Sequence, residues 1–435
     1  MQTRPAKVAV PSRCLAMRKQ RGVVAVFVAI GLLSILLMAG LALDSGHMML
    51  NKSRLQNTVD AAALSAAKAL DQTGDSTLAT AEAMLAFANN AAALGNAELA
   101  TAYGGGGGGG FLQVVVEYSA TLPPFTPGAA GPYVRVTATG FTMPAWLIGL
   151  AGFTEKSVSA QAVAGPRTLN VGSTACNIAP MMVCGDPAQP NNLWGYTLNE
   201  PVVLKSGAPG GNWGVGPGNF QLVDFGSGAN TVRQNMAGSY ESCIAGGSTI
   251  QTQPGSEVGP VSQGLNTRFG QYNGPMNGTQ AQYPPDVIVD GQSPQVTAQQ
   301  NANGTYSVRQ GGTVITSQNI DQLYNYQDYM TDLAHPERYD YQPTNDGGIG
   351  AFDRRVVAVP VGNCSTTVNG SGSVPLLGFA CFFLLQPVSP GGGTSFVFGQ
   401  FVQGCEVAGT PGSNPIAGSG PNIIQLYHTP NSQQS

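Results

Sequence analysis

The sequence predicts an α+β protein: a single N-terminal transmembrane helix continues into an Ala-rich helical hairpin, and a predominantly β exported region with disulfides follows. Three observations predict this class. Residues 22–43 form an apolar run without a charged side chain, residues 44–103 are rich in alanine, and the remainder alternates short apolar runs with turns. The 59 glycines and 30 prolines favour short strands, while 42% hydrophobic residues suffice for a core.

The apolar run from Gly22 to Leu43 is long enough to cross a membrane, because 22 residues at about 1.5 Å each span the roughly 30 Å hydrocarbon core. All 23 acidic residues lie at or beyond Asp44. The tail of residues 1–21 is basic and contains Arg4, Lys7, Arg13, Arg18, Lys19 and Arg21. This asymmetry predicts a cytoplasmic tail and an exported remainder.

A cleaved secretory signal is the alternative interpretation of the same run. A signal peptide has a shorter apolar region and ends in small residues at the cleavage site. Here Leu41-Ala42-Leu43 places leucines where small residues are needed. We therefore expect an uncleaved anchor.

Residues 44–103 are expected to form a helical stalk. Apolar residues recur there at alternating spacings of four and three, which is typical of a narrow helix-packing seam; they are Leu55, Val59, Ala62, Ala66 and Ala69. Gly74 ends the first helix, and residues 77–100 form a second helix that folds back onto it. A local hairpin is favoured, and packing against another chain is compatible with it.

Residues 104–165 are expected to contain a flexible glycine joint and a small α+β unit. The glycines Gly104 to Gly110 lead into a strand and lack the Lys-Ser/Thr of a mononucleotide-binding loop. Strands are predicted at residues 112–118, 133–139 and 158–164. Residues 141–153 are apolar but too short to span a bilayer, so they form a packing helix or a patch on the membrane surface.

Residues 166–435 are expected to form a β-rich domain outside the membrane. The predicted strands lie at residues 201–205, 220–225, 286–290, 355–361 and 396–402. The Gln/Asn-rich residues 271–325 suggest a long surface excursion, and the tail after Tyr427 is expected to fray.

The cysteines indicate disulfides in an oxidising compartment. Cys14 precedes the apolar run, and the other six are exported: Cys176, Cys184, Cys243, Cys364, Cys381 and Cys405. Six cysteines allow 15 pairings, and the short spacing makes Cys176–Cys184 the first expected pair. A metal site is the alternative, but no histidine lies near a cysteine, so we expect neither a metal nor a cofactor.

The residues that resemble catalytic motifs are incomplete. Asp224-Phe225-Gly226 lacks the companion motifs of a kinase and the serines of a von Willebrand A metal loop. His335 lies near Asp332 and Asp340 without an evident nucleophile, which favours a surface polar cluster. The acidic excess of the exported region also excludes a nucleic-acid partner. We therefore expect a protein that is not an enzyme.

Residues 21–70 resemble the N-terminal segment of TadG-like Flp (tight adherence) pilus-assembly proteins. The resemblance rests on the apolar span, an Asp-x-Gly exit, a Leu-Gln-Asn step and an Asp-Ala-Ala-Ala-Leu helix. The residues that carry it are Asp44, Gly46, Arg54, Leu55, Gln56, Asn57, Asp60, Ala61, Ala62 and Leu64. Downstream, residues 176–184, 217–222 and 264–269 look like the exported region of proteobacterial members.

The resemblance implies a non-enzymatic component of Flp pilus assembly or secretion in the bacterial inner membrane. The protein would be single-pass, with a cytoplasmic N-terminus and a periplasmic C-terminal region. Its partners would be membrane lipid, other pilus-assembly or pilin subunits, and an outer-membrane secretin or a cell-surface ligand. Gly31, Ala39 and Gly40 offer small surfaces for helix packing in the membrane.

Three alternatives to this assembly role stay open. A minor pseudopilin would be cut after Gly22 and enter the fibre, although Phe27 stands where pseudopilins carry glutamate. A surface adhesin would use the Gln/Asn-rich region. A tethered hydrolase would depend on His335 or Asp332.

Overall fold

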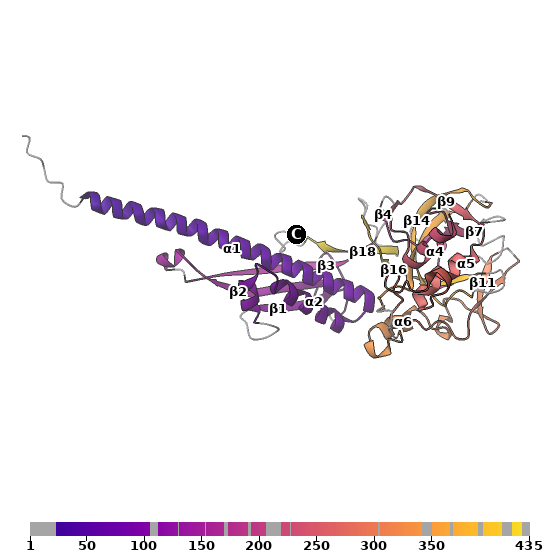
Figure 1. Cartoon of the computed structure of the whole chain (residues 1–435). Coiled ribbons are helices and arrows are strands. Elements are labelled where there is room, and N and C mark those ends of the chain that lie inside the picture. The colour runs from indigo at the N-terminus through magenta and orange to yellow at the C-terminus, as the bar shows by residue number, and fades with distance from the viewer. Residues whose placement is uncertain are drawn as a thin grey trace, which may run out of the picture.

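The computed structural model shows an elongated molecule with a long helix at one end and a globular head at the other (Figure 1). The basic tail, Cys14, Gly22 and residues 105–111 of the glycine joint lie outside the described residues. The structure describes residues 23–104, 112–128, 130–152, 154–168, 173–189, 193–205, 219–226, 228–302, 305–341, 350–365, 369–389, 395–410 and 420–428.

The stem consists of three helices and one five-stranded sheet. Its helices are α1 (Val23–Thr73), α2 (Ser76–Ala91) and α3 (Ala97–Tyr103). Its strands are β1 (Gln113–Ser119), β2 (Tyr133–Pro144), β3 (Glu155–Thr168), β16 (Gly404–Glu406) and β18 (Gly420–Tyr427). A 3-10 turn, η1 (Ile148–Ala151), lies at the tip between β2 and β3.

The predicted helical hairpin is confirmed in the stem. Gly74, at φ +68°, ends α1, and the carboxylate of Asp75 accepts the amide of Thr77 at 2.6 Å to begin α2. The seam residues Leu55, Val59, Ala62 and Ala66 are fully buried and share one cluster with Ala79, Ala83, Phe87 and Ala91 of α2. The second predicted helix is divided, because the chain turns between Ala91 and Ala97 before α3.

The stem sheet has the order β1-β2-β3-β18-β16. Strands β1, β2, β3 and β18 are antiparallel neighbours, and β16 runs parallel to β18. Alternate residues of β2, including Val134, Val136 and Ala138, are buried beneath the helices, as the two-residue period of a strand requires. The register pairs Thr168 at the end of β3 with Asn422 of β18, so the chain leaves and re-enters the stem at adjacent positions.

The head comprises residues 173–402 together with β17 (Gly409–Thr410). Its strands are β4 (Thr174–Ala175), β5 (Val183–Gly185), β6 (Pro201–Lys205), β7 (Asn219–Val223), β8 (Ile244–Ala245), β9 (Thr249–Pro254), β10 (Thr297–Gln300), β11 (Tyr306–Gln310), β12 (Thr313–Val314), β13 (Val356–Asn363), β14 (Ser373–Leu384) and β15 (Val397–Val402). Its helices are α4 (Ala229–Gly238), α5 (Val258–Leu265) and α6 (Tyr326–Leu333). Its 3-10 turns are η2 (Leu193–Gly195), η3 (Asn266–Phe269), η4 (Gly274–Met276), η5 (Ile320–Gln322) and η6 (Pro336–Arg338).

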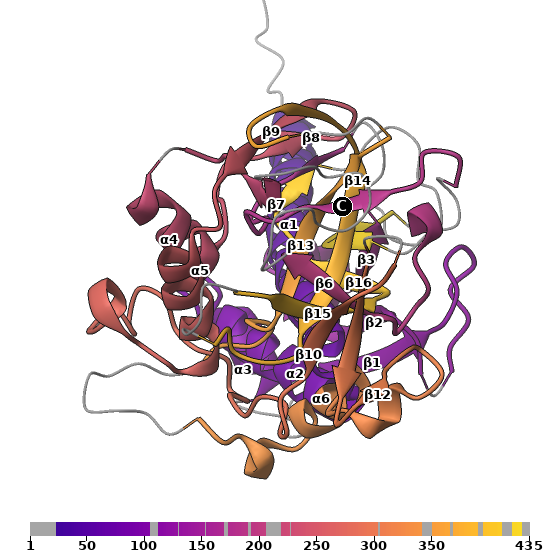
Figure 2. The ribbon, with the colours of Figure 1, turned by 90° about the vertical axis from the view of Figure 1, so that its right-hand side faces the viewer.

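The central sheet of the head, β5-β13-β14-β15-β6, is covered on both faces. Along β14, Phe379, Cys381 and Phe383 belong to one core, and Ala380 and Phe382 belong to the other. Helices α4 and α5 pack into the second core, on one side of the sheet (Figure 2). Burial on both faces explains the continuous apolar sequence of this strand.

Three disulfides are present, and the expected Cys176–Cys184 pair is wrong. The pairs are Cys176–Cys243, Cys184–Cys364 and Cys381–Cys405. Cys184 lies on β5, which pairs in parallel with β13, so its side chain reaches Cys364 just beyond β13. Sheet pairing between distant segments, rather than loop length, therefore determines the partners.

Two further expectations for the head differ from the structure. Residues 286–290 form no strand; only Asp286 makes an isolated bridge, to Ala351. The Gln/Asn-rich residues 271–325 are not a surface excursion, because their sparse apolar side chains enter the head core: Val287, Ile288, Val296, Val308, Ile315 and Leu323. These buried positions could not be predicted from the sequence because the apolar residues are sparse and lie among polar residues.

Candidate functional site

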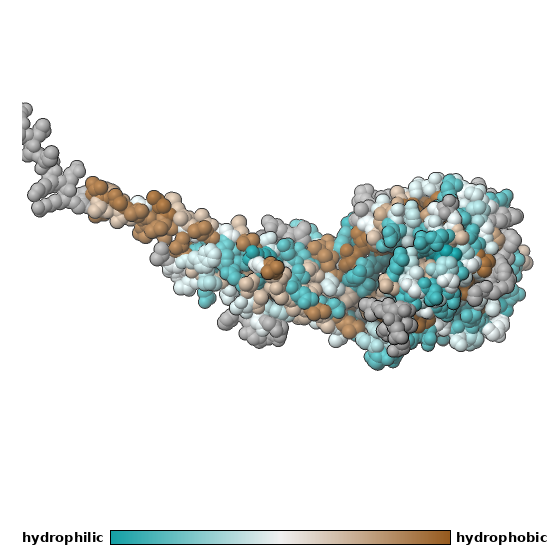
Figure 3. Space-filling model, viewed as in Figure 1, coloured by the Kyte–Doolittle hydropathy of each residue, from teal (hydrophilic) through white to brown (hydrophobic). Residues whose placement is uncertain are grey.

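The N-terminal part of α1 projects from the molecule as an apolar rod (Figure 3). Phe27 is 70% exposed and Met38 is 73% exposed, whereas Leu55, farther along the same helix, is fully buried. Within the described residues, α1 is the one helix long and apolar enough to cross a membrane. The change from exposed to packed side chains begins at Gly40, where the stem first contacts the helix, and Asp44 follows one turn later.

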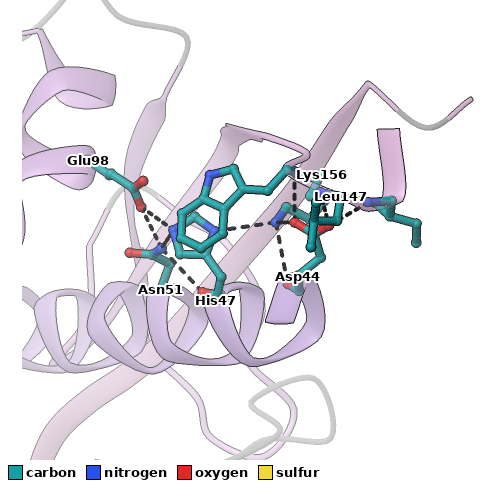
Figure 4. A network of polar contacts seen from close by, with 8 residues as sticks. Asp44, His47, Asn51, Glu98, Leu147 and Lys156 are labelled. Carbon is teal, nitrogen blue, oxygen red and sulfur yellow. Dashed lines mark hydrogen bonds and ion pairs between the residues drawn. The ribbon is translucent and has the colours of Figure 1, made fainter. Parts of the chain in front are cut away.

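Asp44 is the centre of a polar cluster at this transition (Figure 4). Its Oδ1 accepts the amide of Trp146 at 2.9 Å, and its Oδ2 accepts those of Leu147 at 3.0 Å and Ile148 at 2.8 Å. The ammonium of Lys156 donates to Oδ1 at 2.7 Å. We call these four interactions the Asp44 clamp. It ties α1 to the β2–β3 tip, which we define as residues 145–152 and 154 together with Lys156 at the start of β3.

The clamp keeps Asp44 ionised although its side chain is only 2% exposed. The hydrogen bond from Lys156 and those from the amides of Ile148, Trp146 and Leu147 hold the pKa of this carboxyl well below its usual range. These donors replace the water that the carboxylate loses on burial. An acid can therefore remain charged at the end of the apolar run.

A second set of contacts extends the cluster along the next turn of α1. His47 Nδ1 lies 3.3 Å from the ammonium of Lys156, and its Nε2 lies 2.7 Å from a carboxylate oxygen of Glu98 of α3. The amide of Asn51 donates to the same carboxylate at 2.7 Å. The ring of Trp146 stacks on His47 with centroids 4.3 Å apart. Residues from α1, α3 and the β2–β3 tip are thereby fixed together.

Gly40 allows the β2–β3 tip to approach α1 closely. A Cβ at this position would lie 2.7 Å from Cβ of Leu147, closer than side chains approach one another. Gly40 therefore has a local role in admitting the tip against α1. Ala39 and Gly31 remain on the exposed part of the helix, and Gly31 has open space around it.

The family-motif residues beyond Asp44 divide between packing and a polar groove. Leu55 and Ala62 are buried in the stem core, Ala61 and Leu64 are partly buried, and Gly46 is exposed. A groove of about 640 Å³ lies between α1 and the neighbouring strands β2 and β3. Its lining residues are Met49, Lys52, Ser53, Gln56, Asn57, Thr137, Thr139, Ser159, Ala160 and Gln161.

Gln56 bridges the helix and the sheet within this groove. Its amide donates to Asp60 at 2.8 Å and to the carbonyl of Gln161 at 3.0 Å. Asn57 is exposed beside it, and partly buried Arg54 lies near Gly95 at the turn after α2. The Leu-Gln-Asn step thus contributes one core residue, one bridge and one exposed amide.

The joint between stem and head contains a second polar cluster. A cavity of about 580 Å³ is lined there by Asp71, Asp353, Glu406 and Asn422, among others. Burial, followed by repulsion from Glu406, raises the pKa of Asp71 to about 6. Lys68 of α1 pairs with Glu406 of β16 at 3.4 Å.

The motif-like residues of the head do not assemble a catalytic arrangement with one another. His335 contacts Glu337 at 3.0 Å, while Asp332 accepts Arg338 at 2.7 Å and the hydroxyl of Tyr324 at 2.9 Å. Asp224 accepts the amide of Gly226 at 3.0 Å, as in an ordinary turn. Across the part of the chain that the structure describes, no three His, Cys, Asp or Glu side chains are grouped to hold a metal ion.

Sequence reasoning singled out Asp44 but not its partners. Lys156, Trp146 and Glu98 lie 47 to 112 residues from the helix positions they contact; the shortest separation joins Glu98 to Asn51 and the longest joins Lys156 to Asp44. The signal available was the apolar Trp146-Leu147-Ile148 segment, for which a membrane-surface patch was one of two interpretations. The structure places this segment at the exit of the apolar helix.

The match with a known family falls on this same region. Residues 22–69 match the family model described as "Putative Flp pilus-assembly TadE/G-like". No curated protein and no solved structure matches the chain. The matched residues contain the exposed apolar rod, Asp44 and the buried seam of the helical hairpin. Residues 22–69 of this chain are therefore similar to the TadE/G-like segment of Flp pilus-assembly proteins.

Proposed function

We propose that this protein is a membrane-anchored, non-enzymatic component of the Flp/Tad pilus-assembly or secretion machinery. The observation that carries the proposal is that the TadE/G-like match coincides with a helix that is exposed and apolar up to about Asp44 and packed on one face against the stem beyond it. Such a helix supplies an anchor and holds a folded stem directly at the membrane surface.

The expected topology places the basic tail in the cytoplasm and the head in the periplasm of a bacterial inner membrane. The basic residues before the apolar run and the absence of acids before Asp44 support this orientation. Three disulfides, two within the head and one that joins it to the stem sheet, support an oxidising compartment. The stem and head would contact pilin subunits, other assembly proteins or an outer-membrane secretin.

A rigid spacer is the mechanical role that the geometry supports. The Asp44 clamp fixes the stem to the anchor, and the Cys381–Cys405 disulfide fixes the head to the stem sheet. A force applied to the head would be transmitted through the stem to α1, and no catalysed reaction is needed for this role. We therefore propose scaffolding as the mechanism.

A minor pseudopilin is the second candidate, and the shape of α1 favours it. Its apolar half is free of the stem, so copies of the helix could pack side by side in a fibre as readily as in a membrane. This role would require cleavage after Gly22. The Gln/Asn-rich adhesin alternative has no comparable support, since that region packs into the head core.

The test is peptide mapping of the N-terminus in washed membranes and in mechanically sheared surface fibres. An intact basic N-terminus found only in membranes is the expected result. A new terminus at Val23, with the protein in the sheared fraction, would instead identify a fibre subunit. Deleting the gene should abolish pilus assembly, and normal piliation in its absence would contradict the assembly role.

A further inference from the structure

The β2–β3 tip lies at the depth where the apolar run of α1 ends. Leu147 occupies the space left by Gly40, three residues before the end of the run at Leu43, or about 5 Å along the helix axis. Figure 1 shows the β2–β3 hairpin extending along α1 farther than the rest of the stem. A membrane that surrounds the run up to Leu43 therefore reaches the tip.

The side chains of the tip are graded in polarity along this direction. Leu147 lies level with Gly40, whereas Trp146 stacks on His47, about 10 Å farther from the apolar run. Trp146 is 55% exposed, and the ammonium of Lys156 lies 5.7 Å from the centroid of its ring. Tryptophan and lysine are the residues that favour the head-group level, and aliphatic side chains favour the layer beneath it.

The backbone of the tip is also prepared for a water-poor environment. Backbone amides that enter lipid need partners within the protein. Asp44 accepts three successive amides of the tip, Ala145 donates to the carbonyl of Thr154 at 3.0 Å, and Gly152 donates to that of Gly149 at 3.0 Å. The clamp and these two bonds thus give five backbone amides of the tip a partner within the protein.

We propose that the β2–β3 tip inserts into the membrane leaflet on the side of the head, beside α1, and forms a second lipid contact. Leu147 and Ile148 enter the upper acyl region, and Trp146 and Lys156 remain among the phospholipid head groups. Lipid is the partner of the tip because the tip is continuous with the exposed apolar surface of α1 and lies beside the end of its apolar run. Two contacts at different points would fix the tilt and rotation of the anchor. The inference requires α1 to span the membrane and is independent of the pilus role.

Three glycines with open space for a Cβ allow a matched test: Gly149 in the tip, Gly31 in the apolar run and Gly259 in α5 of the head. Each is changed separately to cysteine in a full-length Cys14→Ser chain, spin-labelled, and reconstituted in phosphatidylcholine–phosphatidylglycerol vesicles. Power-saturation electron paramagnetic resonance then compares collisions with oxygen, which concentrates in lipid, and with a water-soluble nickel complex.

The expected oxygen-to-nickel ratio at Gly149→Cys is several-fold above that at Gly259→Cys and lies toward the value at Gly31→Cys. A ratio at Gly149→Cys equal to that at Gly259→Cys overturns the proposal while leaving the anchor intact. Shielding of Gly149→Cys from both reagents overturns it in favour of a protein neighbour. Nickel access at Gly31→Cys overturns both the span and the insertion.

A measurement on the otherwise unmodified chain guards against disturbance by the label. Brominated phospholipid should quench part of the tryptophan emission of the full-length protein, and Trp146→Phe should remove most of that quenching. Equal quenching of the two chains would contradict insertion of the tip. Retention of the three disulfides in both chains confirms that the head remains folded.

Discussion

Asp44 shows how one side chain can join an exposed apolar helix to a folded body. Its carboxylate accepts four donors from a hairpin whose residues lie more than a hundred positions away. Each donor would lose water on burial, so the acid and the donors stabilise one another. The family-motif aspartate therefore has a structural explanation in this chain.

Replacing Asp44 with asparagine should release the β2–β3 tip. The amide side chain retains one acceptor oxygen, loses the ion pair with Lys156 and turns an NH2 group toward backbone donors. We expect the amides of Trp146, Leu147 and Ile148 to exchange with solvent roughly tenfold faster or more, as measured by hydrogen-exchange mass spectrometry. Asp75→Asn is the control, since asparagine caps a helix as well as aspartate does. Unchanged exchange at the tip would show that the clamp is dispensable.

Asp71 should make the joint between stem and head weaker at neutral pH than at mildly acidic pH. Its pKa of about 6 in the folded protein lies above its ordinary value near 3.8, so the folded state binds this proton more tightly. The associated stability is complete below about pH 3.8 and is lost as the pH rises through about 6. Glu406, Lys68 and Asp353 face the same joint.

The measurement is thermal unfolding of wild type and Asp71→Asn at pH 5 and pH 7. We expect the substitution to raise the unfolding free energy at pH 7 by about 1–2 kcal/mol. We also expect the unfolding free energy of the variant to differ less between pH 5 and pH 7 than that of wild type. Asp75→Asn, four residues farther along, should leave that change as in wild type. A less stable Asp71→Asn protein at pH 7 would mean that the ionised carboxylate stabilises the joint.

At the scale of elements, small residues let the two hairpin helices approach closely. The seam changes from leucine and valine to alanine along α1, and Ala79 and Ala83 of α2 pack in the same buried cluster. Close approach leaves little room for a larger side chain. Because these alanines are buried between α1 and α2, the seam is filled by the helices of a single chain.

Ala83→Leu should therefore destabilise the stem by about 1–3 kcal/mol through overpacking. Ala81→Leu on the exposed side of α2 is the matched control and should change the unfolding free energy by less than about 0.5 kcal/mol. Chemical denaturation followed by circular dichroism provides the comparison. Equal effects of the two substitutions would indicate that the α1–α2 seam is not closely packed.

The Cys381–Cys405 disulfide should hold the head to the stem. Cys381 lies on β14 of the head and Cys405 on β16 of the stem sheet, whereas the other two disulfides join residues within the head. Changing both cysteines to alanine should lower the unfolding free energy by about 3 kcal/mol and speed protease cleavage between head and stem. Cys14→Ala should do neither. Cleavage at the wild-type rate would show that packing alone secures the joint.

For the whole molecule, the orientation across the membrane is open to a direct chemical test. In spheroplasts, an impermeant maleimide should label Gly259→Cys in the exposed head of a Cys14→Ser chain. Cys14 of the wild-type chain should react only after lysis, because the basic tail is expected in the cytoplasm. The opposite pattern would reverse the proposed topology.

Local patterns predicted the long apolar helix and the helical hairpin, whereas the disulfide pairs and the partners of Asp44 depend on contacts between distant residues. The seam from Leu55 to Ala66 follows the helical period, so its buried face could be read directly. Cys184 pairs with Cys364 across 180 residues, and Lys156 meets Asp44 across 112, separations that carry no local pattern. The buried apolar positions between residues 271 and 325 were missed because each stands alone among polar neighbours.

The return of β18 to the stem also dictates when the stem sheet can be completed. Tyr427 and its strand fill the place beside β3, whose Thr168 is translated some 250 positions earlier. Both β18 and β16 are missing from the sheet until the head has been synthesised. A product that ends before β18 would therefore leave residues 163–168 of β3 with an open edge at the end of the stem next to the head, where this edge is exposed to proteases and to mispairing. The chain order thus makes closure of the stem sheet depend on prior synthesis of the whole head.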